Sequence, residues 1–316
     1  MYSRISEKKV ELFGRTVSGE DIRLTTDELT REPLAYAPET REIIYVSVAD
    51  GSGQTLKAIN LNTLAIRGLM ANPAPAVYSP AVSPDGSEIA YEYDDPQSDR
   101  AIRNTRVISL VDGAVHETIE NAFSLSWSAD GLSLAYMDWW PHESESTRHI
   151  RVRDISEMDR EIHAPQDVEL MQVTWNGFRD ELLAIGEHPV TKPNLYRVDL
   201  ATGEFHQLTI DTMVYPPVVV SPDGASLAYV SWPNEGNRLF VMRNDSADIQ
   251  GFDFPAGWYL EPTWFQDGRY VALKAIVFEG HTPKDQMYVV DTHDGTWTTA
   301  GEALVNEVII RMVIVK

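Results

Sequence analysis

A short polar turn followed by an apolar strand recurs along the whole chain. In the clearest copy, Ser83-Pro84-Asp85-Gly86 precedes Ile89-Ala90-Tyr91. Proline suits the second position of a type I turn and glycine the fourth, while the apolar triplet is typical of a buried strand. The triplet recurs at intervals of about 45 residues. Its six copies are Ile43-Ile44-Tyr45, Ile89-Ala90-Tyr91, Leu134-Ala135-Tyr136, Leu183-Ala184-Ile185, Leu227-Ala228-Tyr229 and Val271-Ala272-Leu273.

Each repeat divides into four short strands, A to D. In the fourth repeat they cover residues 171–175, 182–185, 195–200 and 205–209, and Ala201-Thr202-Gly203 forms the C–D turn. No segment shows a long helical period, so we expect little helix. A period of this length with four strands predicts an all-β fold, a β-propeller of four-stranded antiparallel blades.

The two ends of the chain bear on the number of blades. Residues 10–25 resemble a C–D hairpin, and residues 307–316 form a β-branched segment typical of a strand. Joining them would build one extra blade and remove exposed sheet edges. We therefore expect seven blades, with the closing blade shared by the N- and C-termini, and six blades as the alternative. Residues 1–316 then form a single β-propeller domain, made of an N-terminal hairpin (1–28), six repeats (29–300) and a closing strand (301–316).

The repeat also resembles a known family. Ser-Pro-Asp-Gly followed by Ile-Ala-Tyr is similar to the WD40-like repeat of TolB-like β-propellers, and to propeller domains of prolyl-oligopeptidase relatives and oligogalacturonate lyases. The resemblance covers residues 32 to 300. It implies a propeller fold. It does not select one activity, because the family includes binding scaffolds, peptidase gates and a lyase.

Composition excludes several classes of partner and site. The chain has 48 acidic and 26 basic residues, a net charge of −22, which argues against nucleic acid and anionic membranes as partners. It has no cysteine, which excludes disulfides and thiolate chemistry. Since residues 1–10 lack a long apolar segment, we expect a soluble, cytoplasmic monomer without membrane insertion. An exported form whose signal has been removed stays open.

Two serine motifs do not predict a nucleophile. Residues 131–135 and 224–228 superficially resemble a Gly-x-Ser-x-Gly elbow, but both occupy the same repeat position before strand B. The aspartates of the repeated turns are expected to cap them. Trp127, Trp175 and Trp264 occupy the inner-strand position of a structural aromatic. We therefore predict no catalytic residue.

The B–C loops are the better place to look for function. In propellers these loops lie on the face opposite the A–B and C–D turns. The predicted binding residues there are Asp94, Asp95, Trp139, Trp140, His142, Glu143, His188, Trp232 and His281. Trp139 and Trp140 suit either ring stacking or packing between blades, whereas Trp232 is more typical of packing. His142, His188 and His281 are weak metal candidates, so we expect no cofactor, with a divalent metal as the alternative.

These observations favour a non-catalytic scaffold that binds a protein or peptide on the B–C loop face. Two alternatives come from the resemblance. One is a metal-assisted carbohydrate lyase or hydrolase of the oligogalacturonate lyase type, although this sequence lacks the His-Pro pairs that the resemblance would require. The other is a stand-alone propeller gate related to prolyl-oligopeptidase-type enzymes. No proton-transfer pair is evident among the residues that begin strand A, namely Glu32, Tyr78, Phe123, Leu170, Pro216 and Leu260.

Overall fold

The computed structural model shows β-strands joined by turns. It describes residues 2–6, 9–15, 21–25, 29–49, 53–95, 103–139, 148–154, 159–177, 180–210, 212–232, 238–244, 248–254, 257–279, 282–302 and 307–308. These residues contain no α-helix, as the sequence predicts, and hence no helix that could cross a membrane. The chain divides into two compact units. Unit 1 comprises Met1–Gly131 and Asn306–Val313, and unit 2 comprises Leu132–Val305 and Ile314–Lys316.

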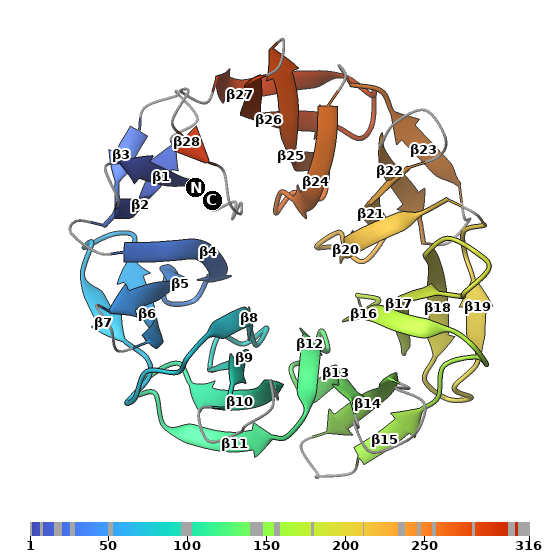
Figure 1. Ribbon diagram of the computed structural model, residues 1–316, viewed down its shortest axis with the longest axis horizontal. Helices are drawn as coiled ribbons and strands as arrows, with labels where there is room; N and C mark the ends of the chain where they lie inside the picture. The colour runs from blue at the N-terminus through green and yellow to red at the C-terminus, as the bar shows by residue number, and fades with distance from the viewer. Residues whose placement is uncertain are drawn as a thin grey trace. The chain divides into compact units, whose positions relative to one another are not determined.

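Unit 1 contains three four-stranded sheets and the first strand of a fourth (Figure 1). One sheet has the order β28 (Glu307–Val308), β1 (Tyr2–Ser6), β2 (Lys9–Arg15) and β3 (Asp21–Arg23). The next has β4 (Leu29–Ala37), β5 (Glu42–Ala49), β6 (Gly53–Asn60) and β7 (Ile66–Gly68). The third has β8 (Val77–Val82), β9 (Glu88–Asp94), β10 (Arg103–Ser109) and β11 (Val115–Ile119), and β12 (Ala122–Trp127) follows it.

Unit 2 continues the same pattern. The fourth sheet goes on from β12 to β13 (Ser133–Trp139), β14 (Arg148–Asp154) and β15 (Asp159–Ile162). The fifth has β16 (Glu169–Trp175), β17 (Glu181–Glu187), β18 (Asn194–Asp199) and β19 (Phe205–Gln207). The sixth has β20 (Val214–Val220), β21 (Ser226–Ser231), β22 (Arg238–Arg243) and β23 (Ile249–Phe252). The last has β24 (Gly257–Trp264), β25 (Tyr270–Glu279), β26 (Thr282–Asp291) and β27 (Trp297–Glu302).

Six of these sheets each consist of four consecutive strands from one repeat. They confirm an all-β fold of four-stranded antiparallel blades, and they account for six blades. The remaining sheet mixes strands from both ends of the chain. There β28 pairs with β1 through two residue pairs, Ser3–Val308 and Arg4–Glu307. The six blades of consecutive strands do not confirm the favoured count of seven blades, which stays a prediction.

The repeated turn is held by its own side chains. The Gly86 N–H donates to the Ser83 carbonyl at 2.9 Å, and Gly86 adopts a φ of +69°, where a side chain would be strained. Asp85 Oδ1 accepts from the Ser83 hydroxyl at 2.6 Å and from the Ser87 N–H at 3.1 Å. The Ser83 hydroxyl lowers the pKa of Asp85, with further help from Ser87. These bonds confirm that the turn aspartate is a capping residue.

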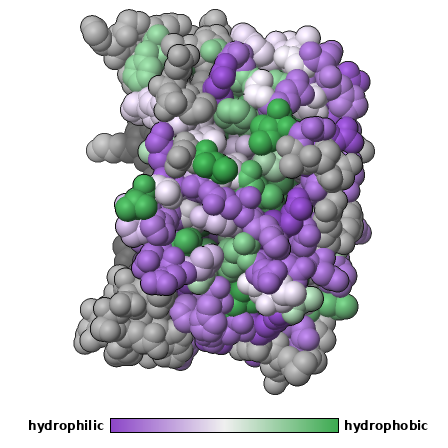
Figure 2. Space-filling model, turned by 90° about the vertical axis from the view of Figure 1, so that its right-hand side faces the viewer, coloured by the Kyte–Doolittle hydropathy of each residue, from purple (hydrophilic) through white to green (hydrophobic). Residues whose placement is uncertain are grey.

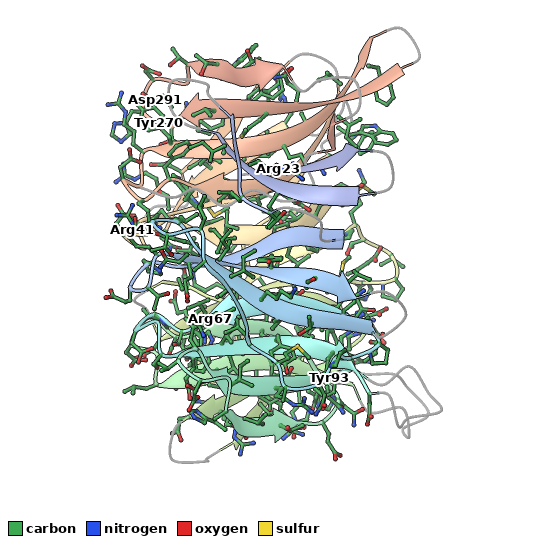
Figure 3. All side chains as sticks on the ribbon, turned by 90° about the vertical axis from the view of Figure 1, so that its left-hand side faces the viewer. Arg23, Arg41, Arg67, Tyr93, Tyr270 and Asp291 are labelled. Atoms are coloured by element: carbon green, nitrogen blue, oxygen red, sulfur yellow. The ribbon has the colours of Figure 1, made fainter. Side chains whose placement is uncertain are left out.

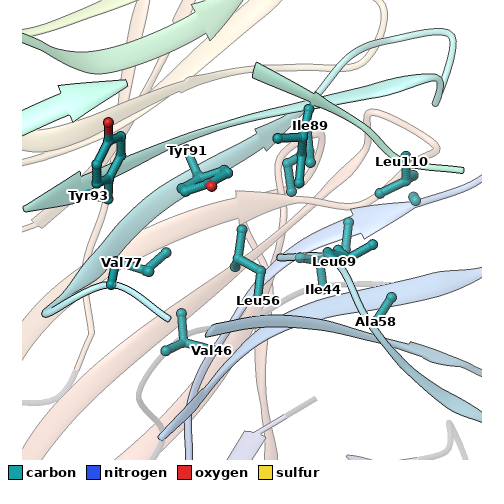
Figure 4. Close-up of a cluster of buried hydrophobic side chains, with 13 residues drawn as sticks. Ile44, Val46, Leu56, Ala58, Leu69, Val77, Ile89, Tyr91, Tyr93 and Leu110 are labelled. Carbon is teal, nitrogen blue, oxygen red and sulfur yellow. The ribbon is translucent and has the colours of Figure 1, made fainter. Parts of the chain in front are cut away.

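The apolar triplets form the centre of each blade. In unit 1, Ile44 of β5 and Leu56 of β6 pack in one cluster with Ile89 and Tyr91 of β9 and with Leu110, so two neighbouring blades share a core (Figure 4). Each of these side chains is fully or almost fully buried. Complete burial of one such side chain contributes about 1.5–3 kcal/mol. Packing between successive repeats therefore holds the blades together.

Polar bonds also join successive blades. The Trp127 Nε1–H donates to the Ala81 carbonyl at 3.0 Å in unit 1, and the Trp264 Nε1–H donates to the Val219 carbonyl at 3.2 Å in unit 2. Both donors lie at the end of strand A and both acceptors lie in strand A of the preceding blade. The structural role expected for these two tryptophans is thus realised through the indole N–H as well as the ring.

Candidate functional site

Each four-stranded sheet has two distinct ends. We call the end with the A–B and C–D turns the turn end, and the end where strands A and C begin and B and D finish the loop end. In unit 1, Arg41 lies in the turn between β4 and β5, whereas Tyr93 lies near the end of β9, and Figure 3 shows them toward opposite ends of the strands. By their positions in the sequence, all nine predicted binding residues belong to the loop end.

The structure describes five of those nine residues in part or in full. Asp94 ends β9 and Asp95 follows it, both half-buried. His188 is half-buried, and its Nδ1 accepts the Val190 N–H at 3.3 Å. Trp232 is exposed, and its backbone N–H donates to the Met213 carbonyl at 3.2 Å. Trp139 ends β13. The remaining four lie outside the described residues, namely Trp140, His142, Glu143 and His281.

Asp94 belongs to a polar cluster at the loop end of unit 1. The Tyr78 hydroxyl donates to Asp94 Oδ2 at 3.0 Å, and the Arg103 guanidinium lies 4.0 Å above the Tyr78 ring. Burial raises the pKa of Tyr78, and its bond to the Asp94 carboxylate raises it further. A β-bulge after Tyr78, with Ser79 at a φ of 40°, interrupts the register of β8 there. Tyr78, one of the residues that begin strand A, is therefore a hydrogen-bond donor to Asp94.

Glu92 forms the buried part of the same cluster. It is 2% exposed, and its Oε1 accepts the Ser124 backbone N–H at 2.8 Å. Its Oε2 accepts from Arg103 Nη1 at 3.2 Å. Burial raises the pKa of Glu92, and the bonds from Ser124 and Arg103 oppose that rise. A buried carboxyl group with a raised pKa can act as a general acid. Both oxygens of Glu92 already accept hydrogen bonds, however, from Ser124 and Arg103. The arrangement therefore supports a role in holding these two residues in place rather than in proton transfer.

Several exposed hydrophobic side chains of unit 2 belong to the same end of its sheets, the loop end. Figure 2 shows one side of the molecule, where hydrophobic residues form small groups among hydrophilic ones. Isolated exposed hydrophobic residues are normal on any protein surface. At the loop end of unit 2, however, the described exposed hydrophobic residues belong to connections or strand ends of three successive blades. They are Val190, Ile210, Trp232, Trp258 and Phe278.

Sequence reasoning identified only Trp232 among these five. Trp258 and Phe278 are contributed by the neighbouring strands β24 and β25, and their rings meet edge to face with centroids 5.7 Å apart. Strand periodicity alone does not reveal that both are exposed. Val190 and Ile210 carried a usable signal, since each is a β-branched apolar residue between polar or proline neighbours in a connection. We call Val190, Ile210, Trp232, Trp258 and Phe278 the apolar loop group.

One group among the described residues brings together three potential metal ligands. It consists of His149, Glu161 and His163, whose ligand atoms all lie within 4.8 Å of one another. None of the three histidines predicted as metal candidates belongs to it. These residues lie on or beside the outer strands of a blade, β14 and β15.

No family model matches the sequence, and no significantly similar curated protein is found. Solved structures are similar in fold. TolB from Acinetobacter baumannii has a TM-score of 0.59 and 17% identity, over 85% of this chain and 64% of that chain. An oligogalacturonate lyase in complex with manganese has 0.68 and 14%, over 92% and 84%. The β-propeller domain of the trilobed protease from Pyrococcus furiosus has 0.64 and 18%, over 86% and 84%.

The chain has the fold of the TolB-like β-propellers. The resemblance expected from the Ser-Pro-Asp-Gly repeat is thereby confirmed for the fold. At these identities the similarity concerns the fold alone, because one propeller fold carries many functions. This propeller also spans less than two thirds of the TolB chain it matches.

Proposed function

We propose that this TolB-like propeller is a non-catalytic scaffold that binds a protein or peptide at its loop end. The observation that carries the proposal is the apolar loop group of unit 2. Trp258 is 52% exposed and Val190 is 83% exposed, although both residue types are normally buried. Aromatic side chains at exposed positions supply a large share of binding energy in protein interfaces. Sites for peptides use such anchors inside a polar surround.

Charge supports a particular kind of partner. The chain has a net charge of −22, and the exposed Glu187 lies three residues before Val190. A negatively charged surface attracts cationic segments and speeds their association. We therefore propose a peptide segment that carries apolar side chains next to lysine or arginine. For the predicted binding residues Asp94 and Asp95 of unit 1, we propose a contact of their own with cationic side chains.

The remaining predicted binding residues keep their proposed role. Trp139, Trp140, His142 and Glu143 belong to one loop, and His188 and His281 belong to two others. His188 uses Nδ1 to accept the Val190 N–H, which leaves its Nε2 for a partner. We propose that these residues contribute polar and aromatic contacts around the apolar loop group.

A matched pair of valines tests the proposal. Val190 and Val111 are 83% and 80% exposed, but Val190 lies at the loop end and Val111 follows β10 at the turn end. The probe is a peptide selected from a random library on the purified full chain. We expect Val190→Ser and Trp232→Ser to weaken peptide binding, measured by isothermal titration calorimetry, and Val111→Ser to leave it unchanged. Equal binding to all three variants would overturn the proposal.

We also propose that the propeller has seven blades, with the closing blade formed by β28, β1, β2 and β3. The pairing of Ser3 with Val308 and of Arg4 with Glu307 supports this proposal. So does the general advantage of joining the two chain ends in one blade, which ties the first and last strands of the chain together.

A further inference from the structure

A row of polar side chains crosses the outer strands of one blade in unit 2. In the pairing of β14 with β15, Ile150 lies opposite Ile162 and Arg151 lies opposite Glu161. His163 directly follows β15, so the same register brings it opposite His149. Alternate residues of a strand share one face, and directly opposite residues point to the same side. The register therefore places His149, Arg151, Glu161 and His163 on one face.

The distances within this group suit a common ligand. Glu161 Oε1 lies 2.8 Å from His149 Nδ1 and 3.3 Å from His163 Nε2. The two imidazole rings meet edge to face with centroids 4.6 Å apart. In a tetrahedral zinc site, ligand bonds of about 2.0–2.2 Å separate neighbouring ligand atoms by roughly 3.3–3.5 Å. Small side-chain rotations would bring all three atoms to that spacing.

A second set of bonds fixes the carboxylate of Glu161. Its other oxygen, Oε2, accepts from Arg151 Nη2 at 2.6 Å, and Arg151 Nε donates to Asp138 Oδ2 at 2.7 Å. Asp138 is 4% exposed, and its Oδ1 accepts the backbone N–H of His149 at 3.3 Å. One buried aspartate thus anchors both the strand that carries His149 and the arginine that orients Glu161. Such supporting bonds to the ligands are typical of metal sites.

We propose that His149, Glu161 and His163 bind a Zn²⁺ ion, with water as a fourth ligand. Two imidazole nitrogens and one carboxylate oxygen form the donor set that zinc accepts in open sites. Magnesium and calcium prefer oxygen ligands only, so they fit this group poorly. The exposure of His163, at 69% of its side chain, leaves space for the water molecule. The zinc proposal does not rest on peptide binding by the apolar loop group.

Calorimetric titration of the full chain with Zn²⁺ tests the proposal, using protein without a histidine tag. We expect one equivalent to bind, and His163→Ala and His149→Ala each to weaken binding at least about tenfold. His206→Ala is the matched control. His206 lies on β19, the outer strand of the next blade, and its Nε2 is 3.9 Å from Glu204 Oε2. The His206→Ala variant should bind zinc as the unmodified chain does.

The acidic surface could bind zinc weakly at many places, so stoichiometry decides the interpretation. Absence of binding by the unmodified chain would overturn the proposal. So would retained affinity in the His149→Ala/His163→Ala double variant, or an equal loss in His206→Ala. Because His163 is exposed, its alanine variant should fold, which circular dichroism checks. Co²⁺ bound to the unmodified chain should also show the strong visible absorption of a four-coordinate site, and the double variant should not.

Discussion

Ser124 donates its backbone N–H to the buried carboxylate of Glu92 at 2.8 Å, from a left-handed backbone with a φ of 56°. The two residues belong to β12 and β9, so the bond joins one blade to the next within unit 1. A non-glycine residue is strained in this region of φ, by about 1–3 kcal/mol. The bond to Glu92 is one interaction that offsets this cost.

Replacing Glu92 by glutamine should change how stability depends on pH. Burial raises the pKa of Glu92 above its ordinary value of 4.5, which means that the folded state favours the protonated form. Its stabilising contribution is therefore present below pH 4.5 and is lost as the pH rises through the raised pKa. Glutamine keeps an oxygen for the Ser124 N–H and never ionises.

Urea unfolding of both proteins between about pH 4 and pH 8 measures this effect. As the pH rises, the free energy of unfolding of the Glu92→Gln variant should increase relative to that of the unmodified chain. A difference that stays constant over the whole range would contradict the prediction.

Asp291 should have the opposite pH dependence. Its bond with Arg269 is the largest cause that lowers its pKa from 3.8 to about 2, and Arg269 Nε lies 2.9 Å from Asp291 Oδ2. A lowered acid pKa stabilises the folded state above pH 3.8, and this contribution is lost as the pH falls toward about 2. Asp291→Asn should therefore be less stable than the unmodified chain near neutral pH, and the difference should close in acid.

Acid unfolding followed by circular dichroism measures the Asp291 effect. Asparagine keeps an oxygen that can accept the His293 N–H, as Asp291 Oδ1 does at 3.0 Å, so the turn is preserved. Arg269→Gln removes the other partner of the pair. This variant should also be less stable than the unmodified chain near neutral pH, and the difference in stability should also become smaller in acid. If the difference in stability between Asp291→Asn and the unmodified chain stayed constant down to the lowest pH, the Asp291–Arg269 pair would not be the cause of the pH dependence.

Arg67 should stabilise the contact between two blades of unit 1. Its guanidinium bonds to both oxygens of Glu42, at 2.9 and 2.6 Å, and to the Leu110 carbonyl of the next blade at 2.6 Å. Arg67→Met leaves the buried Glu42 carboxylate without this partner, which should lower the free energy of unfolding by about 1–3 kcal/mol.

A double-mutant cycle separates the Arg67–Glu42 pair from other effects. Adding Glu42→Gln to Arg67→Met should recover part of the loss. Arg41→Met, at an exposed position in a turn of the same blade, is the control and should change stability by less than about 0.5 kcal/mol. Strictly additive effects of the Arg67 and Glu42 substitutions would argue against direct coupling.

The closing blade can be tested by a disulfide. Ser3 of β1 lies directly opposite Val308 of β28, and opposite Cα atoms in an antiparallel pair are about 4.5–5.5 Å apart. This spacing lies within the range that disulfides bridge. The chain has no cysteine of its own, so Ser3→Cys/Val308→Cys contains only the designed pair.

We expect that pair to oxidise to an intramolecular disulfide, detected by mass spectrometry after thiol alkylation. Ser3→Cys/Val111→Cys, whose second cysteine lies in a turn of another sheet, should remain reduced under the same conditions. Failure of the designed pair to oxidise in a folded protein would leave six blades as the better count.

The fold was predictable because its signals are local. Each blade is made of strands that are neighbours in the sequence. A blade can therefore be identified from two local signals, the spacing between triplets such as Ile89-Ala90-Tyr91 and the turn before each triplet. The sequence singles out Tyr78 and Asp94 separately, but their hydrogen bond depends on a bulge in β8 that no residue pattern predicts.

The outer strands explain what sequence reasoning missed. His149 and His163 lie 14 residues apart, and only the register of β14 against β15 brings them together. Short outer strands such as β15 and β19 bury few residues, so their apolar periodicity is too weak to predict that register.

The indole bonds of Trp127 and Trp264 have a consequence for how such a chain can change in evolution. Each donor lies at one repeat position, and each acceptor lies at a second position in the preceding repeat. A duplicate of either repeat that carries such a tryptophan would bring both its own donor and its own acceptor, and deletion of that repeat would remove one of each. Recombination can therefore add or remove a repeat that ends in such a tryptophan without leaving its indole N–H unsatisfied at the new junction.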